Sequence, residues 1–493
     1  MTATNRMALG AEQSDALANV QTGLLIGGWR TVLEKLPVEN PATGKVIAEV
    51  ADGTADDGVE ALDAAVRAQR GWAATTARYR ADVLHHLYAA VIESREELAL
   101  LITTEMGKPL AEARGEVDYA ADYVRWYAEE AVRLDGRSLT TPNGRSEVVT
   151  YRGPVGPCLL ITPWNFPLAM GLRKVAPALA AGCTVVWKPA DLTPLTALRA
   201  ASLMLEAGVP EGVVNVVTTT DAASFSATVM ADPRLRKVSF TGSTPVGRRL
   251  LAQASEGVLK SSMELGGNAP LLVLEDADVD RAVEGAFVAK LRNGGQSCVA
   301  ANRMYVHEKV ADAFVEAFAA RVARVAFGNG MDAATDLGPL IDGRAVDKVA
   351  GLVTDAVARG AKVLAGGVVP DGPGYFYPAT VLDHVAPGSR LLGEEIFGPV
   401  APIVRFQDEG EAILHANATP FGLAAYLFTE NGDRARRVAA ALDAGMVGVN
   451  QGAISDASVP FGGVKQSGLG REGGAEGIED YTELKFVSTP SVR

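Results

Sequence analysis

A single cysteine, Cys298, lies in the stretch KLRNGGQSCVAANRMYV (residues 290 to 306), just after a Gly-Gly pair. The thiolate is the reactive form of cysteine, and a nearby positive charge or a helix N-terminus lowers the pKa of the thiol. The preceding helical pattern ends near Asn293 and Gly294, so Cys298 follows a helix C-terminus in a turn that glycine permits. This turn exposes the sulfur without acidifying it, although Arg292 could supply charge. The local sequence therefore fits either a nucleophile or an ordinary loop cysteine.

Two further polar residues adjoin predicted strands and could take part in carbonyl chemistry. Glu264, in KSSMELGGNAPLLVL, stands at the entrance to a strand, where a carboxylate can act as a general base for water. Asn165 lies between Pro163 and Pro167, which stop the strand from running directly into a helix. An amide held in such a rigid loop can donate to an oxyanion. Taken alone, Glu264 also fits a solvated loop carboxylate, and Asn165 fits a turn residue.

A third segment, SFTGSTPVGRRL at residues 239 to 250, has the pattern of a strand followed by glycines, hydroxyls and a helix. Gly242, Ser243 and Gly247 could form a backbone cradle for a diphosphate at the helix N-terminus. The spacing differs from G-x-G-x-x-G, so the segment by itself is a weak nucleotide signature.

These residues are carried by alternating strands and helices. Short apolar strand candidates recur from Gly156 onward, with helical patterns between them: CLLIT, CTVVWK, VVNVV, KVSF and PLLVL. Residues 57 to 135 are predicted to be mostly helical, and a second alternating block follows Glu264. Such alternation is typical of parallel sheets covered by helices on both faces. We therefore predict two α/β domains with the site between them. Strand-like pieces at 146 to 153 and 483 to 490 lie outside both blocks and could pair with each other or with a partner subunit.

Composition narrows the class of protein. With 493 residues and 48% hydrophobic content, the chain is long enough for two or three packed domains. A net charge of −13 disfavours nucleic acid or an anionic membrane as a partner. The apolar stretch from 153 to 172 contains four prolines and therefore does not read as a spanning helix. The N-terminus lacks a signal pattern, so the expected location is cytoplasmic.

The three cysteines are too few and too scattered for a disulfide framework or a zinc site, and we expect no metal. Cys158 and Cys183 lie in apolar strand patterns and are predicted to be small buried hydrophobic residues. A cysteine hydrolase would need a histidine partner for its thiol, and none of the five histidines falls in the segments around Asn165 or Glu264. A non-catalytic protein on the same scaffold would be expected to lose Cys298 or Glu264.

Taken together and in order, the segments resemble the NAD(P)-dependent aldehyde dehydrogenase family from about residue 20 to 490. The resemblance rests on PWNFP, KPAD, FTGST, MELGG, GGQSC, EEIFGP and PFGGVKQSGLGREGG. It implies an α/β fold with a Rossmann-type dinucleotide-binding domain, an α/β catalytic domain and a small β oligomerisation element. The corresponding boundaries are 20–132 with 154–264, 265–465, and 133–153 with 478–493. A homodimer or homotetramer is implied as well.

The resemblance also assigns roles to residues. Cys298 is the expected nucleophile, Asn165 with the Cys298 backbone N–H holds the oxyanion, and Glu264 activates water to hydrolyse a thioester. The residues expected to bind the dinucleotide are Trp164, Lys188, Asp191, Gly242, Ser243, Glu395 and Phe397. NAD is favoured over NADP, since the charge of Asp191 should repel a 2′-phosphate, although its short side chain leaves room.

Within the family, the later stretches are most similar to succinate-semialdehyde dehydrogenases. Arg173, Arg292 and Ser455 fall where those enzymes hold the distal carboxylate of the substrate, and guanidinium groups suit bidentate carboxylate binding. Without the family context, either arginine could equally form a structural salt bridge. Glutarate semialdehyde and broader aliphatic or aromatic aldehydes remain alternatives. Many of these enzymes have a second cysteine two positions after the nucleophile, where this chain has Ala300, so we expect no such redox disulfide.

Overall fold

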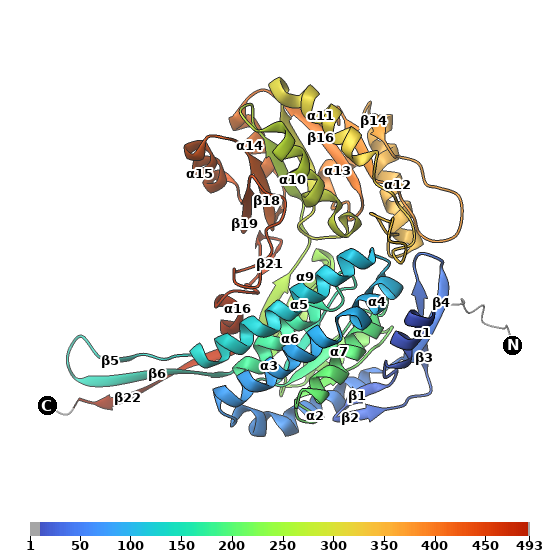
Figure 1. The fold of residues 1–493 in the computed structure, drawn as a ribbon. Helices are drawn as coiled ribbons and strands as arrows, with labels where there is room; N and C mark the ends of the chain where they lie inside the picture. The colour runs from blue at the N-terminus through green and yellow to red at the C-terminus, as the bar shows by residue number, and fades with distance from the viewer. Residues whose placement is uncertain (1–9, 492–493) are drawn as a thin grey trace.

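The computed structural model describes residues 10–491, and its body has two lobes from which a thin arm projects (Figure 1). Each lobe is built on one sheet with helices on both faces. In the described part of the chain, no helix is both long and apolar enough to cross a membrane.

The first lobe contains an eight-stranded sheet whose central five strands are parallel. In spatial order the strands are β2 (Gly28–Arg30), β1 (Leu24–Ile26), β9 (Val214–Val216), β8 (Val185–Lys188), β7 (Cys158–Ile161), β10 (Lys237–Thr241), β11 (Lys260–Glu264) and β21 (Gly468–Leu469). Numbered from β7, the parallel strands have the order 3-2-1-4-5, which is that of a doubly wound dinucleotide-binding fold. The connection reverses between β7 and β10.

Period-two alternation along these strands explains why both faces are covered. Cys158 and Leu160 of β7 join the core under one helical layer, while Leu159 joins the core on the opposite face. The first layer consists of α3 (Ala77–Glu93), α4 (Arg95–Met106), α5 (Leu110–Glu130), α6 (Ala169–Ala181) and α7 (Pro194–Glu206). The second consists of α2 (Ala55–Ala73), α8 (Ala222–Ala231) and α9 (Thr244–Gly257). Cys158 and Cys183 are completely buried, which confirms their prediction as core residues.

The second lobe contains a seven-stranded sheet that is parallel except at one edge. Its strands are β14 (Lys362–Ala365), β15 (Thr380–Asp383), β16 (Val400–Phe406), β13 (Ala301–His307), β12 (Ala269–Val273), β18 (Ala424–Phe428) and β19 (Met446–Val449). The covering helices are α10 (Val279–Leu291), α11 (Glu308–Val322), α12 (Gly343–Ala358), α13 (Arg390–Gly393), α14 (Glu409–Asn417) and α15 (Gly432–Ala441).

The arm is an antiparallel sheet of β5 (Ser138–Thr140), β6 (Ser146–Pro154) and β22 (Thr482–Pro490) (Figure 1). Strands β6 and β22 pair along their whole length, which confirms that the two outlying strand-like segments can pair with each other. Residues 492 and 493, which belong to the expected oligomerisation element, lie outside the described residues, as do residues 1–9.

The remaining elements complete the first lobe and its junction with the second. They are α1 (Ala11–Ala18), the hairpin of β3 (Lys35–Asn40) and β4 (Lys45–Ala51), η1 (Ala131–Arg133), η2 (Arg292–Gly295), the β17 (Phe421–Gly422) and β20 (Val464–Lys465) pair, and α16 (Glu476–Glu479). Strand β21 comes late in the sequence and pairs with β11, the strand that ends at Glu264. The chain therefore returns from the second lobe to the first beside Glu264.

Candidate active site

A cavity of about 400 Å³ lies where the loops of the two lobes meet, and it brings together most of the residues selected from the sequence. Those that line it are Trp164, Asn165, Arg173, Gly242, Ser243, Glu264, Arg292, Cys298, Glu395, Phe397 and Ser455. Lys188 and Asp191 do not line the cavity, although the next residue, Leu192, does.

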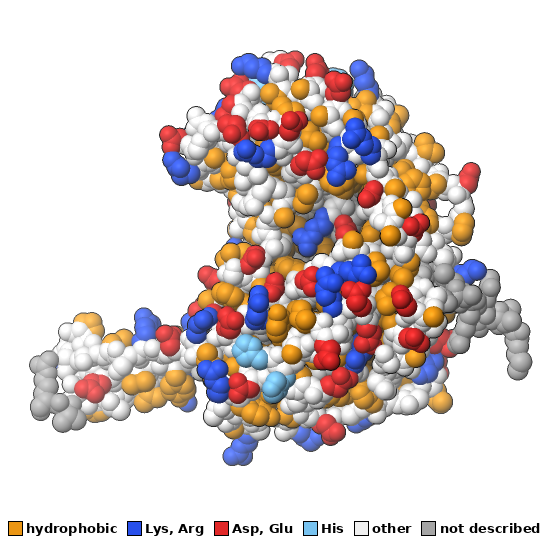
Figure 2. Space-filling view, in the orientation of Figure 1, with side chains coloured by type: hydrophobic (Ala, Val, Ile, Leu, Met, Phe, Trp, Pro, Cys, Tyr) orange, Lys and Arg blue, Asp and Glu red, His pale blue; other side chains and the backbone are white. Residues whose placement is uncertain are grey.

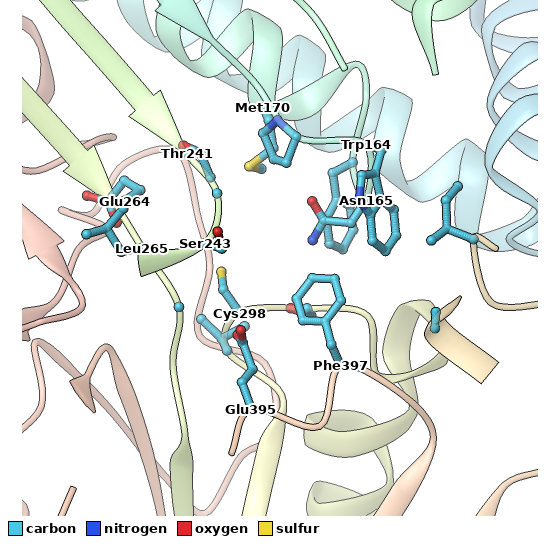
Figure 3. A pocket seen from close by; sticks show the side chains of 18 of the residues that line it. Trp164, Asn165, Met170, Thr241, Ser243, Glu264, Leu265, Cys298, Glu395 and Phe397 are labelled. Atoms are coloured by element: carbon cyan, nitrogen blue, oxygen red, sulfur yellow. The ribbon is translucent and has the colours of Figure 1, made fainter. Parts of the chain in front are cut away.

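The fold explains this convergence. Asn165 follows β7, Ser243 follows β10, and Glu264 ends β11, so all three lie at the carboxyl ends of parallel strands around the point where strand order reverses. Ligands of doubly wound sheets bind in the crevice at this point. The second lobe presents Cys298 from the loop before β13 and closes the crevice from the other side (Figure 3).

Glycine is needed on both sides of the cysteine loop. Asn293, Gly294 and Gly295 have φ values of 56°, 63° and 71°, so the chain turns through three consecutive left-handed residues before reaching Cys298. A side chain at Gly295 would clash with the carbonyl of Gly398, and one at Gly267 would clash with the carbonyl of Cys298. This confirms the glycine-permitted turn predicted from the sequence.

The surroundings of Cys298 favour the neutral thiol. Burial raises the pKa of the Cys298 thiol to about 12, and the Glu395 and Glu264 carboxylates act in the same direction. Arg173 opposes the shift, as does the backbone N–H of Cys298 itself. The sequence suggested Arg292 as the source of positive charge near the sulfur, whereas Arg173 supplies it in the structure.

Asn165 is held firmly beside the cysteine loop. Its Nδ2 donates one hydrogen bond of 2.9 Å to the carbonyl of Gln296, two residues before Cys298. The side chain is 5% exposed, and the amide faces the interior of the cavity (Figure 3). Because Nδ2 carries two N–H groups, the second can donate to an oxygen atom in the cavity.

Glu264 is buried, and neither of its carboxyl oxygens has a hydrogen-bond partner among the described residues. Burial, together with the nearby Glu472 carboxylate, raises the pKa of Glu264 well above its usual range. In Figure 3 the carboxyl group points away from the Cys298 sulfur. A protonated, unpartnered carboxyl group at this place can lose its proton and turn toward the cavity without breaking a hydrogen bond.

Arg173 takes part in an ion pair that the sequence did not reveal. Its Nε lies 2.5 Å from Glu472 Oε2, and Lys174 Nζ donates to the other oxygen of the same carboxylate. The guanidinium also lies over the ring of Phe461, 4.2 Å from its centroid. Arg173 Nη2 is buried without a hydrogen-bond partner among the described residues, so one edge of the guanidinium remains for an anion.

Arg292 is only partly buried and has a different environment. Its guanidinium lies 5.8 Å from the ring centroid of Tyr119 and 5.5 Å from that of Phe166. Between residues 10 and 491 it forms no salt bridge, which leaves its N–H donors for a ligand, although its charge acts on Glu112 and opposes the rise in the pKa of that carboxyl group that burial causes. Ser455 lines the same cavity and supplies a hydroxyl.

The other end of the cavity fits a dinucleotide. The rings of Trp164 and Phe397 meet edge to face with centroids 5.4 Å apart, and burial raises the pKa of Glu395 to about 7. Gly242 and Ser243 line the cavity, and Ser243 is the N-cap of α9, but its side chain accepts no capping hydrogen bond from the first amides of this helix. A diphosphate suits such a terminus. Gly247 does not line the cavity, and its lack of a side chain lets α9 pack against Leu265, whose Cδ2 would lie 2.4 Å from an added Cβ.

Lys188 and Asp191 stand just outside the lining. Burial lowers the pKa of Lys188, and the charges of Asp191 and Asp52 oppose that shift. Asp191 also interacts electrostatically with Arg344, which does line the cavity. The two residues thus flank the crevice near the N-terminal end of α7.

Several site residues were not selected from the sequence. Phe461 and Glu472 fall inside the stretch PFGGVKQSGLGREGG, so their signal was present but no role was given to them. Tyr119 lies on α5, whose pattern is that of an ordinary amphipathic helix, and only the tertiary fold brings it to the cavity.

Comparison with known proteins identifies the family of this chain. The sequence profile described as "Aldehyde dehydrogenase family" matches residues 29–487. The chain belongs to the aldehyde dehydrogenase family. It is therefore an oxidoreductase of the NAD(P)-dependent aldehyde dehydrogenase class, with the fold of that family, as the sequence motifs predicted.

Individual relatives of this aldehyde dehydrogenase agree. A succinate-semialdehyde dehydrogenase of Paenarthrobacter nicotinovorans is 56% identical over 90% of this chain and 98% of its own. A glutarate-semialdehyde dehydrogenase of Pseudomonas putida is 49% identical over 92% of this chain and 94% of its own. The crystal structure of an NADP-dependent enzyme of Escherichia coli superposes with a TM-score of 0.94 at 45% identity, covering 96% of this chain and 99% of that one.

Proposed function

We propose that this aldehyde dehydrogenase oxidises succinate semialdehyde to succinate with NAD+. The observation that carries the proposal is that Arg173, Arg292 and Ser455 line the same cavity as Cys298. Two guanidinium groups and a hydroxyl form a binding site for a carboxylate, and a substrate held there would present its aldehyde carbon to the sulfur.

The first step uses Cys298 and Asn165. The Cys298 thiolate attacks the aldehyde carbon, forming a C–S bond and converting the carbonyl oxygen to an oxyanion. The free N–H of Asn165 Nδ2 and the backbone N–H of Cys298 donate to this oxyanion. When bound, a dinucleotide would supply the acceptor for the hydride of this carbon, and loss of that hydride would leave a thioester on Cys298.

Glu264 acts in the second step. Its carboxylate takes a proton from water, which adds to the thioester carbon, and the C–S bond breaks to release the acid and the thiolate. The raised pKa of Glu264 suits a base that must also hold a proton near neutral pH. Because the carboxyl group points away from Cys298 in Figure 3, Glu264 must rotate into the cavity for this step.

The carboxylate end of the site supports the choice of substrate. Arg292 has no competing ion pair in the described chain, and Arg173 retains an unpartnered Nη2 although Glu472 neutralises its charge. A relative at 56% identity is named for succinate semialdehyde. Glutarate semialdehyde is the alternative, supported by the name of a relative at 49% identity. It has one more methylene, which is worth only about 1 to 3 kcal/mol in pocket discrimination.

A substrate panel tests the proposal. We expect kcat/KM for succinate semialdehyde to exceed that for butanal, which has the same carbon number without the carboxylate, by about 100-fold, in line with a charge-assisted contact. Glutarate semialdehyde and benzaldehyde complete the panel. Equal or better turnover of butanal would contradict carboxylate recognition and leave a broader aldehyde dehydrogenase.

For the cofactor we propose a preference for NAD over NADP. The carboxylate of Asp191 lies near Lys188 at the edge of the crevice, where it would repel a 2′-phosphate. A relative with 45% identity is described as NADP-dependent, so kinetics with both dinucleotides are needed. Roles in dinucleotide binding are proposed for Trp164, Lys188, Asp191, Gly242, Ser243, Glu395 and Phe397.

We also propose that residues 20–132 with 154–264 bind the dinucleotide and that residues 265–465 carry the catalytic cysteine.

The arm, we propose, makes the protein a homodimer or homotetramer. Hydrophobic side chains lie along it (Figure 2), among them Val149, Leu484 and Phe486, which are 51%, 56% and 67% exposed. Light scattering should show an oligomer, and Phe486→Asp should reduce its mass. A monomeric wild-type protein would contradict this assignment.

A further inference from the structure

A buried ion pair lies directly behind the loop that carries Asn165. Lys108 Nζ is 2.6 Å from Glu116 Oε2, and the two residues are 2% and 1% exposed. Burial lowers the pKa of Lys108, and the Glu116 carboxylate opposes that shift. Burying two charges costs free energy unless each charged group also hydrogen-bonds to other partners. The other hydrogen bonds of Lys108 and Glu116 therefore matter more for stability than the attraction between the two charges.

The pair holds both ends of the Asn165 loop. Lys108 Nζ donates to the main-chain carbonyl of Asn165 at 2.9 Å and lies 4.0 Å from the ring centroid of Phe166. The other oxygen of Glu116 accepts from the backbone N–H groups of Leu168 and Ala169, at 2.9 and 3.2 Å, where α6 begins. Rotation of the loop would therefore separate buried charged groups from their partners.

The same carbonyl is also tied to the cysteine loop. Asn293 Nδ2 donates to Asn165 O and to Gln296 O, each at 2.9 Å. Gln296 O is also the acceptor for the Asn165 amide. The Asn165 backbone is thus clamped between Lys108 on one side and Asn293 on the other, and this fixes the distance between its amide and the segment that ends in Cys298.

We propose that Lys108, held by Glu116, is a positioning residue for the oxyanion donor Asn165. The inference rests on the proposed role of Asn165 in the reaction. Lys108 itself touches neither the sulfur nor the cavity, since it is absent from the lining and its ammonium is occupied by Glu116 and Asn165 O. Displacing a group by about 1 Å can reduce catalysis about 100-fold, so a clamp of this kind affects rate without contacting substrate.

A double-mutant cycle tests the proposal with p-nitrophenyl acetate, which requires neither a dinucleotide nor a semialdehyde. Cys298 attacks the ester carbonyl, the C–S bond forms through an oxyanion as p-nitrophenolate leaves, and water then cleaves the thioester. We expect Lys108→Met to lower the acylation rate about 10- to 100-fold in the otherwise wild-type protein. In the Asn165→Ala background, the same change should cost less than about twofold, since the group that Lys108 positions is absent.

Alkylation of Cys298 by iodoacetamide provides the second readout. Here the C–S bond forms as iodide leaves, and no oxyanion develops, so Lys108→Met should leave the alkylation rate within about twofold of wild type. Lys237→Met is the matched control. Lys237, at the start of β10, is also fully buried, donates to Ser262 of β11, and is not part of the cavity lining. We expect it to lower the melting temperature but to leave ester acylation unchanged.

Two results would overturn the proposal. One is an equal loss of acylation rate when Lys108→Met is made in the wild-type protein and in Asn165→Ala. The other is a loss of alkylation rate in Lys108→Met that is as large as its loss of acylation rate. If Lys108→Met does not fold, Glu116→Gln carries the same cycle, because it removes the charge that holds Lys108 and keeps the side-chain shape. A different substrate preference would change none of these readouts, so failure of the semialdehyde assignment remains distinguishable.

Discussion

Arg292→Met should separate substrate recognition from chemistry. Arg292 is partly buried, lies over the rings of Tyr119 and Phe166, and forms no salt bridge within residues 10–491. Methionine keeps the apolar contact with both rings and removes only the charge and its donors. The substitution breaks no salt bridge among residues 10–491. It removes an electrostatic effect on Glu112 that is smaller than that of Lys108, so we expect the fold and the melting temperature to change little.

The size of the effect follows from the contact that is lost. A hydrogen bond to a charged group is worth about 1.5 to 3 kcal/mol, and the flanking rings shield this one from water, which places it near the upper part of that range. A loss of about 2 to 3 kcal/mol corresponds to roughly a 30- to 150-fold lower kcat/KM for succinate semialdehyde. The loss should fall mainly on KM, since the carboxylate is bound in both ground state and transition state.

Steady-state kinetics with succinate semialdehyde and butanal provide the assay. Butanal has no carboxylate, so its kcat/KM should remain within about twofold of wild type. Arg114→Met is the matched control, since Arg114 is a partly exposed arginine on α5 that pairs with Glu96. An equal loss on both substrates would refute recognition of the carboxylate by Arg292, as would the absence of any loss on succinate semialdehyde.

Three further predictions concern the thiol, the base and the cofactor. Since burial raises the pKa of Cys298 to about 12, its thiolate fraction should rise about tenfold per pH unit from about pH 7 to 9. The rate of alkylation by iodoacetamide, measured against Cys298→Ala, should rise in the same way, and a plateau in that range would contradict the raised pKa. Glu264→Gln should form about one NADH per subunit rapidly and then turn over at least about 100-fold more slowly than wild type, because the thioester persists. Stopped-flow absorbance without such a burst of NADH would argue against Glu264 as the hydrolytic base. Asp191→Ser should raise the NADP-to-NAD ratio of kcat/KM about tenfold, as expected for about 1.4 kcal/mol of lost repulsion, and an unchanged ratio would remove Asp191 from cofactor choice.

Local chemistry explains what the sequence could predict. Pro163 and Pro167 end a strand, the glycines before Cys298 permit left-handed turns, and residues after parallel strands meet at one edge of a sheet. The helix before Cys298 ends at Leu291, close to Asn293 and Gly294, where its pattern indicated an end. These features depend on neighbours in the chain, which is why they could be read before the fold was known.

Long-range contacts explain what could not be predicted. The ion pair of Arg173 with Glu472 joins α6 to a segment near the C-terminus, and no local sequence pattern predicts it. The same holds for Lys108, whose partners come from α5 and the loop after β7. Gly247 lies in a nucleotide-like motif, and its packing against Leu265 could not be predicted from that motif either. Charge and packing between distant segments decide these roles.

Mass spectrometry of the covalent intermediate tests the central claim most directly. Glu264→Gln protein, mixed with succinate semialdehyde and NAD+ and quenched in acid, should carry a succinyl thioester on the peptide that contains Cys298. Butanal at the same concentration should give far less butyryl adduct at that site. A succinyl group on another residue, or no adduct while NADH is formed, would contradict oxidation through Cys298.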